Sequence, residues 1–251
     1  MNAPAHGRLV ILSGPSCAGK SPLDKALARL YPKLHARLHK LVLYNSRAPR
    51  PGERDGVDYH FRSREQIEAL REDPRFAVID ARGDVQALDL QALAEQLRDG
   101  DVFFEGNPFA ARLLRTHPSL AGVRRLSVFL APLSREEILE LKDPARRVSL
   151  PDFVAEVMRR KLLRRTRKQQ GEPAPPDLED IETRAGSAYR ELKEACDYDH
   201  VIPSHDGEDS ENWDVAGGPV GDARRALLTF VALLEGQPAP ATEKWESDLM
   251  P

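Results

Sequence analysis

The sequence is short of cysteine, of long apolar runs and of net charge, and each shortage excludes a class of protein. Two cysteines, Cys17 and Cys196, cannot form a disulfide framework or, alone, a zinc site, so a reducing compartment is expected. The N-terminus lacks the apolar core of a signal peptide, and the longest later apolar run, 226–234, is too short to span a membrane. A net charge of -3 creates no overall attraction to nucleic acid or to anionic membranes. We therefore expect a cytoplasmic protein with no membrane contact.

What remains is an ordinary globular composition, with 41% hydrophobic and 31% charged residues. A chain of 251 residues can form one sizeable core with inserted lobes, or two small domains. The sequence contains no internal repeat and carries no signal of oligomeric state.

The most specific motif lies near the N-terminus, where residues 14–21 read G-x-x-x-x-G-K-[ST]. Such a loop turns successive backbone N–H groups toward an anion, and the following helix adds the positive end of its dipole. Its context agrees, because the apolar run 8–13 predicts a buried strand and Leu23, Ala26 and Leu27 recur at helical spacing. A plain glycine turn before an ordinary helix is the alternative. The candidate nucleotide-binding residues are Gly14, Pro15, Ser16, Cys17, Ala18, Gly19, Lys20 and Ser21.

Within this loop two side chains have distinct predicted roles. Lys20 is placed to reach the outer phosphates of a nucleotide and is a candidate catalytic residue. Ser21 is placed to offer its hydroxyl to a magnesium ion whose other ligands are mostly water and phosphate oxygen. ATP and magnesium are the expected cofactors.

A second phosphate-binding segment follows at 45–61. Arg47 and Arg50, separated by a proline, form a stiff pair of guanidinium groups suited to a phosphate, and Tyr59 offers a hydroxyl nearby. Proline and glycine in a charged loop can also mark a simple surface turn.

The segment from Arg47 to Phe61 reads R-x-P-R-x-G-E-x-x-G-x-D-Y-H-F and, downstream of the GPSxxGKS loop, resembles guanylate kinase. In that family the arginines and the tyrosine hold the phosphate of GMP, while the first loop holds ATP. The resemblance implies a transferase that moves a phosphoryl group from ATP to a nucleoside monophosphate, and GMP is the acceptor that it names. It also implies substrate-binding roles for Arg47, Arg50 and Tyr59, and a catalytic one for Arg47.

The chain departs from the family at the positions that read guanine. Leu43 stands where the family has a serine, and 76–79 supplies no carboxylate where the family has a glutamate. The stretch 83–87 lacks the second phosphate-binding tyrosine. Because a buried polar group left without a partner costs ~1–3 kcal/mol, these losses are expected to weaken selection for guanine.

A predicted core strand, 101–105, ends in a carboxylate. The family ends this strand D-x-D, serving magnesium and guanine, and Glu105 and Asn107 occupy those places here. Glu105 could order magnesium-bound water as a Walker B acid does, or could simply be solvated at a strand end. Both residues are candidates for substrate binding, and Glu105 is also a candidate for metal binding.

The strongest basic patch lies between 146 and 168. The family's lid supplies arginines that close over the ATP phosphates, and Arg146, Arg147, Arg159 and Arg160 are candidates, with Arg146 and Arg159 taken as catalytic. Nucleic-acid binding through this patch is disfavoured because interleaved aromatic residues are absent. A solvated helix face is the remaining alternative.

The last third of the chain ends the predicted sheet. The strand 198–202 resembles the family's Y-D-x-V-I, and Ser204 takes the place of the asparagine beside adenine. An acidic, glycine-rich loop is inserted at 205–221, and an apolar face predicts a helix over 222–234. The tail 236–251 is expected to be disordered.

Together these features predict an α/β fold with a P-loop NTPase-type parallel sheet, an inserted acceptor lobe and a helical lid. One domain over 1–235 is expected, with the core at 7–34, 91–141 and 179–235, the acceptor lobe at 35–90, and the lid at 142–178, where 169–177 has no counterpart in the family. A non-catalytic module that kept the fold and binds a phosphorylated partner is the alternative to a kinase.

Overall fold

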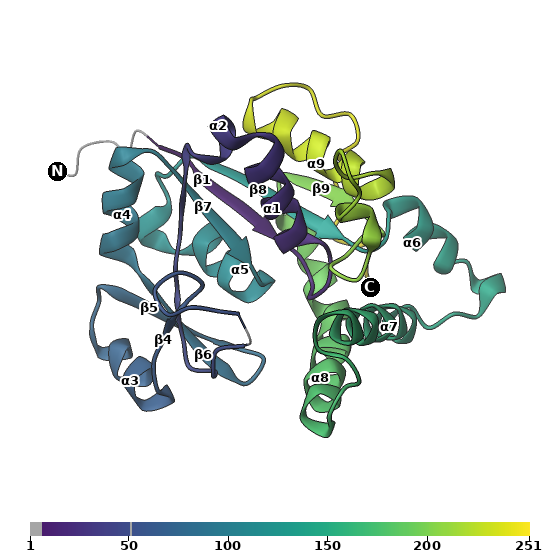
Figure 1. Ribbon diagram of the computed structural model, residues 1–251, viewed down its shortest axis with the longest axis horizontal. Coiled ribbons are helices and arrows are strands. Elements are labelled where there is room, and N and C mark those ends of the chain that lie inside the picture. Colours follow the sequence, from purple (N-terminus) through teal and green to yellow (C-terminus); the bar gives the residue numbers. More distant parts are fainter. Residues whose placement is uncertain (1–6, 51) are drawn as a thin grey trace. The chain divides into compact units, whose positions relative to one another are not determined.

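The computed structural model describes residues 7–50 and 52–251 (Figure 1). Its strands are β1 (Leu9–Ser13), β2 (Leu38–Lys40), β3 (Tyr44–Asn45), β4 (His60–Phe61), β5 (Phe76–Ala81), β6 (Asp84–Asp89), β7 (Asp101–Gly106), β8 (Arg125–Ala131) and β9 (His200–Pro203). Its α-helices are α1 (Lys20–Leu30), α2 (Pro32–His35), α3 (Arg64–Ala69), α4 (Leu90–Asp99), α5 (Pro108–Thr116), α6 (Arg135–Leu141), α7 (Leu150–Gln170), α8 (Pro175–Leu192) and α9 (Gly221–Leu234). Short 3₁₀ turns occupy Leu70–Glu72, Pro118–Leu120, Pro144–Arg146, Lys193–Asp197 and Glu211–Trp213.

The strands form two sheets. The first has the order β2-β7-β1-β8-β9, and in it β2 pairs parallel with β7 and β8 pairs parallel with β9. Every residue of β1 is buried, as expected for a strand with neighbours on both sides and helices over the sheet. The second sheet, β4-β3-β6-β5, is mixed, with β6 antiparallel to both β3 and β5. The predicted α/β class with a parallel core sheet is confirmed.

By its internal contacts the chain divides into two compact units. Unit 1 comprises the described part of Met1–Ile11 together with Ala36–Leu126, and it contains the mixed sheet. A small core of Ile67, Val85 and Ala87 packs under this sheet. Helix α3 is held at its start by Ser63, whose hydroxyl accepts from the Gln66 N–H in a capping box.

Unit 2 comprises Leu12–His35 and Ser127–Pro251. Helices α7 and α8 pack side by side as a long hairpin (Figure 1), and α1 packs on α9. The aromatic rings of Phe129 and Tyr198 pack edge to face, with their centroids 5.0 Å apart. Helix α6 begins with the predicted capping box, in which Ser134 and Glu137 bond each other's backbone N–H groups.

Two segments differ from what the sequence predicts. The second strand is Leu38–Lys40 and not 41–44, because the chain crosses from one sheet to the other at that point: Leu41 N–H still donates to Phe103 O, whereas Leu43 O accepts from His60. Leu41 and Leu43 are nevertheless buried, which explains the apolar signal.

The tail after α9 is packed and not disordered. Trp245 is 2% exposed, and Leu249 and Met250 are also buried. Glu243 forms an antiparallel bridge with Val201, and its carboxylate accepts from the Trp245 indole N–H at 2.7 Å. The polar and proline-rich composition of this segment hid three apolar anchors.

Candidate functional site

The loop between β1 and α1 has a backbone that only glycine permits at two positions. Gly14 has φ +150°, and a Cβ there would lie 2.3 Å from the Leu130 carbonyl oxygen. Gly19 has φ +101°, and a Cβ there would lie 2.6 Å from the Asp206 carbonyl oxygen. The strand, loop and helix follow one another as the motif predicts, so the loop has the close backbone turn that a phosphate cradle requires.

The Lys20 ammonium group and the Gly19 N–H are hydrogen-bond donors of this loop, and both have acceptors in the structure. Lys20 is 6% exposed, and its ammonium group donates to the carbonyl oxygens of Gly14 at 3.1 Å and Pro15 at 2.7 Å. Gly19 N–H donates at 3.0 Å to Oε2 of Glu208, a residue from the inserted loop. The loop thus already binds one carboxylate, which shows that its backbone can hold an oxyanion. Ser21 lies in the first turn of α1.

Cys17 follows in the same loop and is buried. Burial, together with the nearby carboxylates of Glu208 and Asp209, raises the pKa of its thiol well above the ordinary value. This outweighs the acidifying effect of a helix N-terminus, so Cys17 remains a protonated packing residue.

An arginine of α8 contacts the loop. Arg184 is 7% exposed, its Nη1 donates to the Ser16 hydroxyl at 3.3 Å, and its Nε donates to Asp180 at 2.8 Å. The sequence analysis missed it, although a signal exists: Arg184 lies on the same helix face as the buried Ile181 and Ala188. A buried charged residue within an apolar stripe requires partners, and here they are the Asp180 carboxylate and the Ser16 hydroxyl of the phosphate-binding loop.

The predicted lid residues Arg146 and Arg159 bond elsewhere. Arg146 pairs with Glu140 at 3.0 Å and is half exposed. Arg159 is fixed by Glu182 at 2.7 Å and Glu156 at 2.6 Å, and these hydrogen bonds raise its pKa. The acids that hold these two arginines lie on α6, α7 and α8 and not on the phosphate-binding loop.

In unit 1, the residues of the second phosphate motif come together. The Arg47 guanidinium binds the Glu53 carboxylate through two bonds of 2.6 Å and lies 5.1 Å from the centre of the Tyr59 ring. Burial lowers the pKa of Arg47, but hydrogen bonding to Glu53 more than compensates. The Arg50 N–H also donates to Glu53, at 2.7 Å. Glu53 therefore holds the Arg47 guanidinium group and the Arg50 backbone.

Tyr59 is arranged as a hydrogen-bond donor. Burial and then the charge of Glu105 raise the pKa of its hydroxyl, while Arg47 and Arg50 act in the opposite direction. The hydroxyl consequently stays protonated. These influences also locate Glu105, near the end of β7, in the surroundings of Tyr59.

Asn107 has a structural task besides any role in binding. Its Oδ1 accepts from Ala110 N–H at 3.0 Å and caps α5, while its Nδ2 donates to Oε1 of Gln86 at 3.2 Å. Gln86 is 4% exposed, on β6. One hydrogen bond thus joins the two amides within unit 1.

Comparison with known proteins agrees with these two motifs. A family model described as guanylate kinase matches residues 6–78. The guanylate kinase of Alkalilimnicola ehrlichii is 31% identical over 204 residues, which cover 80% of this chain and 82% of that protein. This chain belongs to the guanylate kinase family.

Other relatives match more locally. The guanylate kinase of Mycolicibacterium paratuberculosis is 36% identical over 59% of this chain and 65% of its own length, and that of Mycobacterium bovis is 54% identical over 57 residues, 23% of this chain and 26% of its own. A crystal structure of guanylate kinase from Anaplasma phagocytophilum shares the fold, with a TM-score of 0.51 and 17% identity over 92% of this chain and 86% of that chain.

Ser204, predicted to lie beside adenine, is buried in this structure and is not accessible to a ligand. It is 1% exposed, and its hydroxyl donates to the Asp206 carbonyl at 3.3 Å. Its predicted place beside adenine therefore remains a prediction that requires this loop to move.

The described residues contain neither a metal-binding cluster of side chains nor a helix that could span a membrane. No group of three or more His, Cys, Asp or Glu residues there could hold a metal ion. A nucleotide-bound magnesium ion needs few protein ligands, since it keeps several waters and phosphate oxygens, and the Ser21 hydroxyl fits that requirement. None of the helices over 7–50 and 52–251 is long and apolar enough to cross a membrane.

Proposed function

We propose that this protein is an ATP-dependent phosphotransferase of the nucleoside monophosphate kinase type, with GMP as the first acceptor to test. The observation that carries the proposal is the intact loop of residues 14–21, in which the Lys20 ammonium group bonds to the carbonyl oxygens of Gly14 and Pro15 and the Gly19 N–H holds a carboxylate. A module freed from ATP would have no physical need for both Lys20 and Ser21.

Each residue of the two motifs has a distinct role in this proposal. The loop binds the donor phosphates, Ser21 serves magnesium, and Lys20 stabilises charge on the transferring group. Arg184, anchored on the loop, adds a second positive charge there. Arg47, Arg50 and Tyr59 hold the acceptor phosphate. No catalytic base is required, because the nucleophile is already an ionised phosphate oxygen.

The test is magnesium-dependent release of ADP from ATP with a panel of nucleoside and deoxynucleoside monophosphates, with Lys20→Ala as the matched control. We expect turnover with GMP that disappears in Lys20→Ala and on chelation of magnesium. Turnover with a different monophosphate would mean that the acceptor lobe has been re-specified. No turnover with any acceptor would refute the kinase.

The departures from the family favour one second candidate. Guanine-reading side chains are missing at Leu43 and along 76–79, and Gln86 lies within the stretch that lacks the family's tyrosine. A binding module that recognises a phosphorylated ligand through Arg47, Arg50 and Tyr59 would need none of them. Binding of a phosphorylated ligand that is lost in Tyr59→Phe, without ADP release, would identify this function.

A further inference from the structure

The inserted loop after β9 lies on the phosphate-binding loop. We call residues 205–214 the acidic strap. A Cβ added at Gly207 would lie 2.0 Å from the Cys17 carbonyl oxygen, and the Gly19 position closely approaches Asp206 and the Trp213 ring. The strap therefore covers the start of α1 at van der Waals distance, within unit 2.

At the centre of this contact, Glu208 occupies a donor of the phosphate loop. Its Oε2 accepts from Gly19 N–H at 3.0 Å. In a loop of this type that N–H is one of the groups that hold nucleotide phosphate. A carboxylate oxygen and a phosphate oxygen carry the same sign of charge and accept the same bond, so the two compete for one site.

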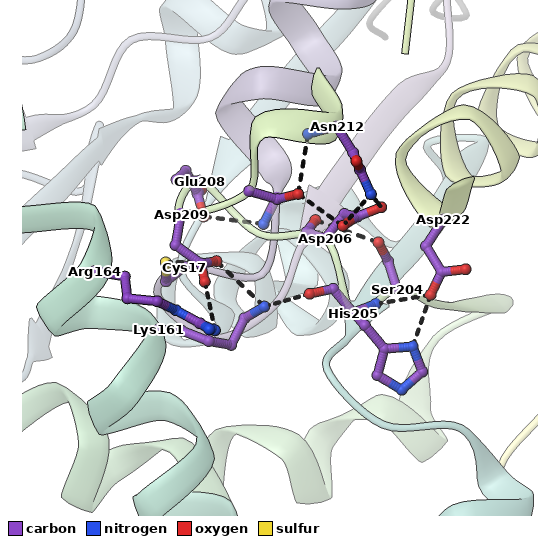
Figure 2. Close-up of polar contacts among 12 residues, drawn as sticks. Cys17, Lys161, Arg164, Ser204, His205, Asp206, Glu208, Asp209, Asn212 and Asp222 are labelled. Carbon is purple, nitrogen blue, oxygen red and sulfur yellow. Dashed lines mark hydrogen bonds and ion pairs between the residues drawn. The ribbon is translucent and has the colours of Figure 1, made fainter. Parts of the chain in front are cut away.

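A second acid of the strap pairs with two cations of α7 (Figure 2). The Asp209 side chain is 4% exposed and pairs with Lys161 at 3.3 Å and with Arg164 at 2.8 Å. The Lys161 ammonium also donates to the His205 carbonyl oxygen. The strap therefore pairs with Lys161 and Arg164, two cations that could bind a polyphosphate, and also bonds to the phosphate-binding loop.

The strap is preorganised by Asp206, which lies near its start. The carboxylate of Asp206 accepts from the Ser210 hydroxyl at 2.7 Å, from the Asn212 amide at 3.0 Å and from Ala223 N–H at 2.9 Å. Its carbonyl accepts from the Trp213 indole at 3.1 Å. Next to it, His205 bonds Asp222 at 2.7 Å and Glu137 at 2.8 Å. Because the strap is held in shape, Glu208 is presented to the loop without a further ordering cost.

We propose that the acidic strap is an autoinhibitory element, in which Glu208 acts as a phosphate mimic that a nucleotide must displace from the Gly19 N–H. Asp209 holds the strap closed by pairing with α7, and a polyphosphate that satisfies both the loop and these cations opens it. The inference rests on the proposed ATP site, but it concerns binding and not transfer.

The first experiment compares the Kd of magnesium ATP, and of inorganic tripolyphosphate, for the full chain and for Glu208→Gln. Gln keeps the length of the side chain and removes the charge. Glu211→Gln is the matched control, because Glu211 lies on the same strap, is 80% exposed and pairs only at the surface with Lys168. We expect Glu208→Gln to bind both ligands about tenfold more tightly, equivalent to ~1.4 kcal/mol, and Glu211→Gln to stay within about twofold of the native Kd.

The second experiment measures amide hydrogen exchange over 205–214. We expect the strap to be protected in the nucleotide-free protein and to exchange faster when ATP or tripolyphosphate binds. The Asp209→Asn variant, which weakens the attachment to α7, should exchange faster without ligand.

The outcomes separate this proposal from the proposed function. An unchanged or weakened affinity in Glu208→Gln, or a strap that stays protected with ATP bound, would overturn autoinhibition and leave the kinase standing. Tighter binding in Glu208→Gln without turnover on any acceptor would support the strap and remove the kinase.

Discussion

Arg184 offers the sharpest test of how this site works, because its closest neighbours are known and a control is at hand. Its side chain is 8% exposed, bonded to Asp180 and to Ser16 of the phosphate loop. We predict that Arg184→Ala lowers the kcat of acceptor-dependent ADP release, while Arg159→Ala does not.

The magnitude follows from the surroundings of Arg184. Two unit charges about 4 Å apart in a partly buried site, with an effective dielectric constant near 20, interact by about 4 kcal/mol. At ~1.36 kcal/mol for each factor of ten in rate, that is about a thousandfold. Asp180 already shares the guanidinium charge, so we expect a loss of about a hundredfold to a thousandfold. Arg184→Lys should recover part of the rate, since it keeps the charge without the planar fork.

The assay measures kcat and KM for ATP in each variant, with the melting temperature as a check on folding. Arg159 is the control, since its bonds to Glu182 and Glu156 lie at the surface, and exposed pairs contribute only ~0–1 kcal/mol. If Arg184→Ala kept its kcat within about threefold, or if Arg159→Ala lost as much, the assignment drawn from the Ser16 contact would be refuted.

Three further predictions concern stability and reactivity. Trp245→Ala should lower the free energy of unfolding by about 3–5 kcal/mol and the melting temperature by roughly 10 °C, measured by thermal unfolding; a shift below about 2 °C would contradict tail docking. Burial lowers the pKa of His205, but its hydrogen bonds to two carboxylates more than offset this, so its pKa is raised overall. Its contribution to stability is therefore full below its ordinary pKa of ~6.5 and is lost as pH rises through the raised value. Urea unfolding should show a free energy of unfolding that declines over this pH range, and the decline should be smaller in His205→Gln. In native protein a thiol reagent should modify the half-buried Cys196 first and leave Cys17 unmodified, and equal rates at both would disprove the burial argument.

The parts predicted from sequence are those with a local physical cause. The run before residue 14 predicts β1 because consecutive apolar residues suit a strand covered on both faces, and the Ser134 and Glu137 spacing predicts a helix start because a capping box is formed within four residues. The family was recognisable because two phosphate motifs occur in order.

What could not be predicted depends on contacts between distant segments. Nothing in the sequence around Glu208 indicates that its carboxylate meets Gly19, since only the closed fold brings the two together. The lid arginines were proposed from the resemblance to the family's lid without a fixed register, yet Arg146 and Arg159 pair with neighbouring acids, and Arg184, outside the basic patch, bonds to the loop. Trp245 was lost in a tail of disordered composition because burial of one indole leaves no periodic pattern.

The amide pair of Asn107 and Gln86 has a consequence for substitutions at these two positions. Asn107 serves as the cap of α5 through its oxygen and as the partner of Gln86 through its nitrogen. Changing Asn107 alone to the family's aspartate would preserve the cap, but the Gln86 amide would have to rotate so that its nitrogen faces the new carboxylate. Changing Gln86 alone to tyrosine would leave the Asn107 amide without its acceptor. Positions 86 and 107 are therefore coupled, and we expect the effect of Asn107→Asp combined with Gln86→Tyr on the free energy of unfolding to differ from the sum of the two single changes.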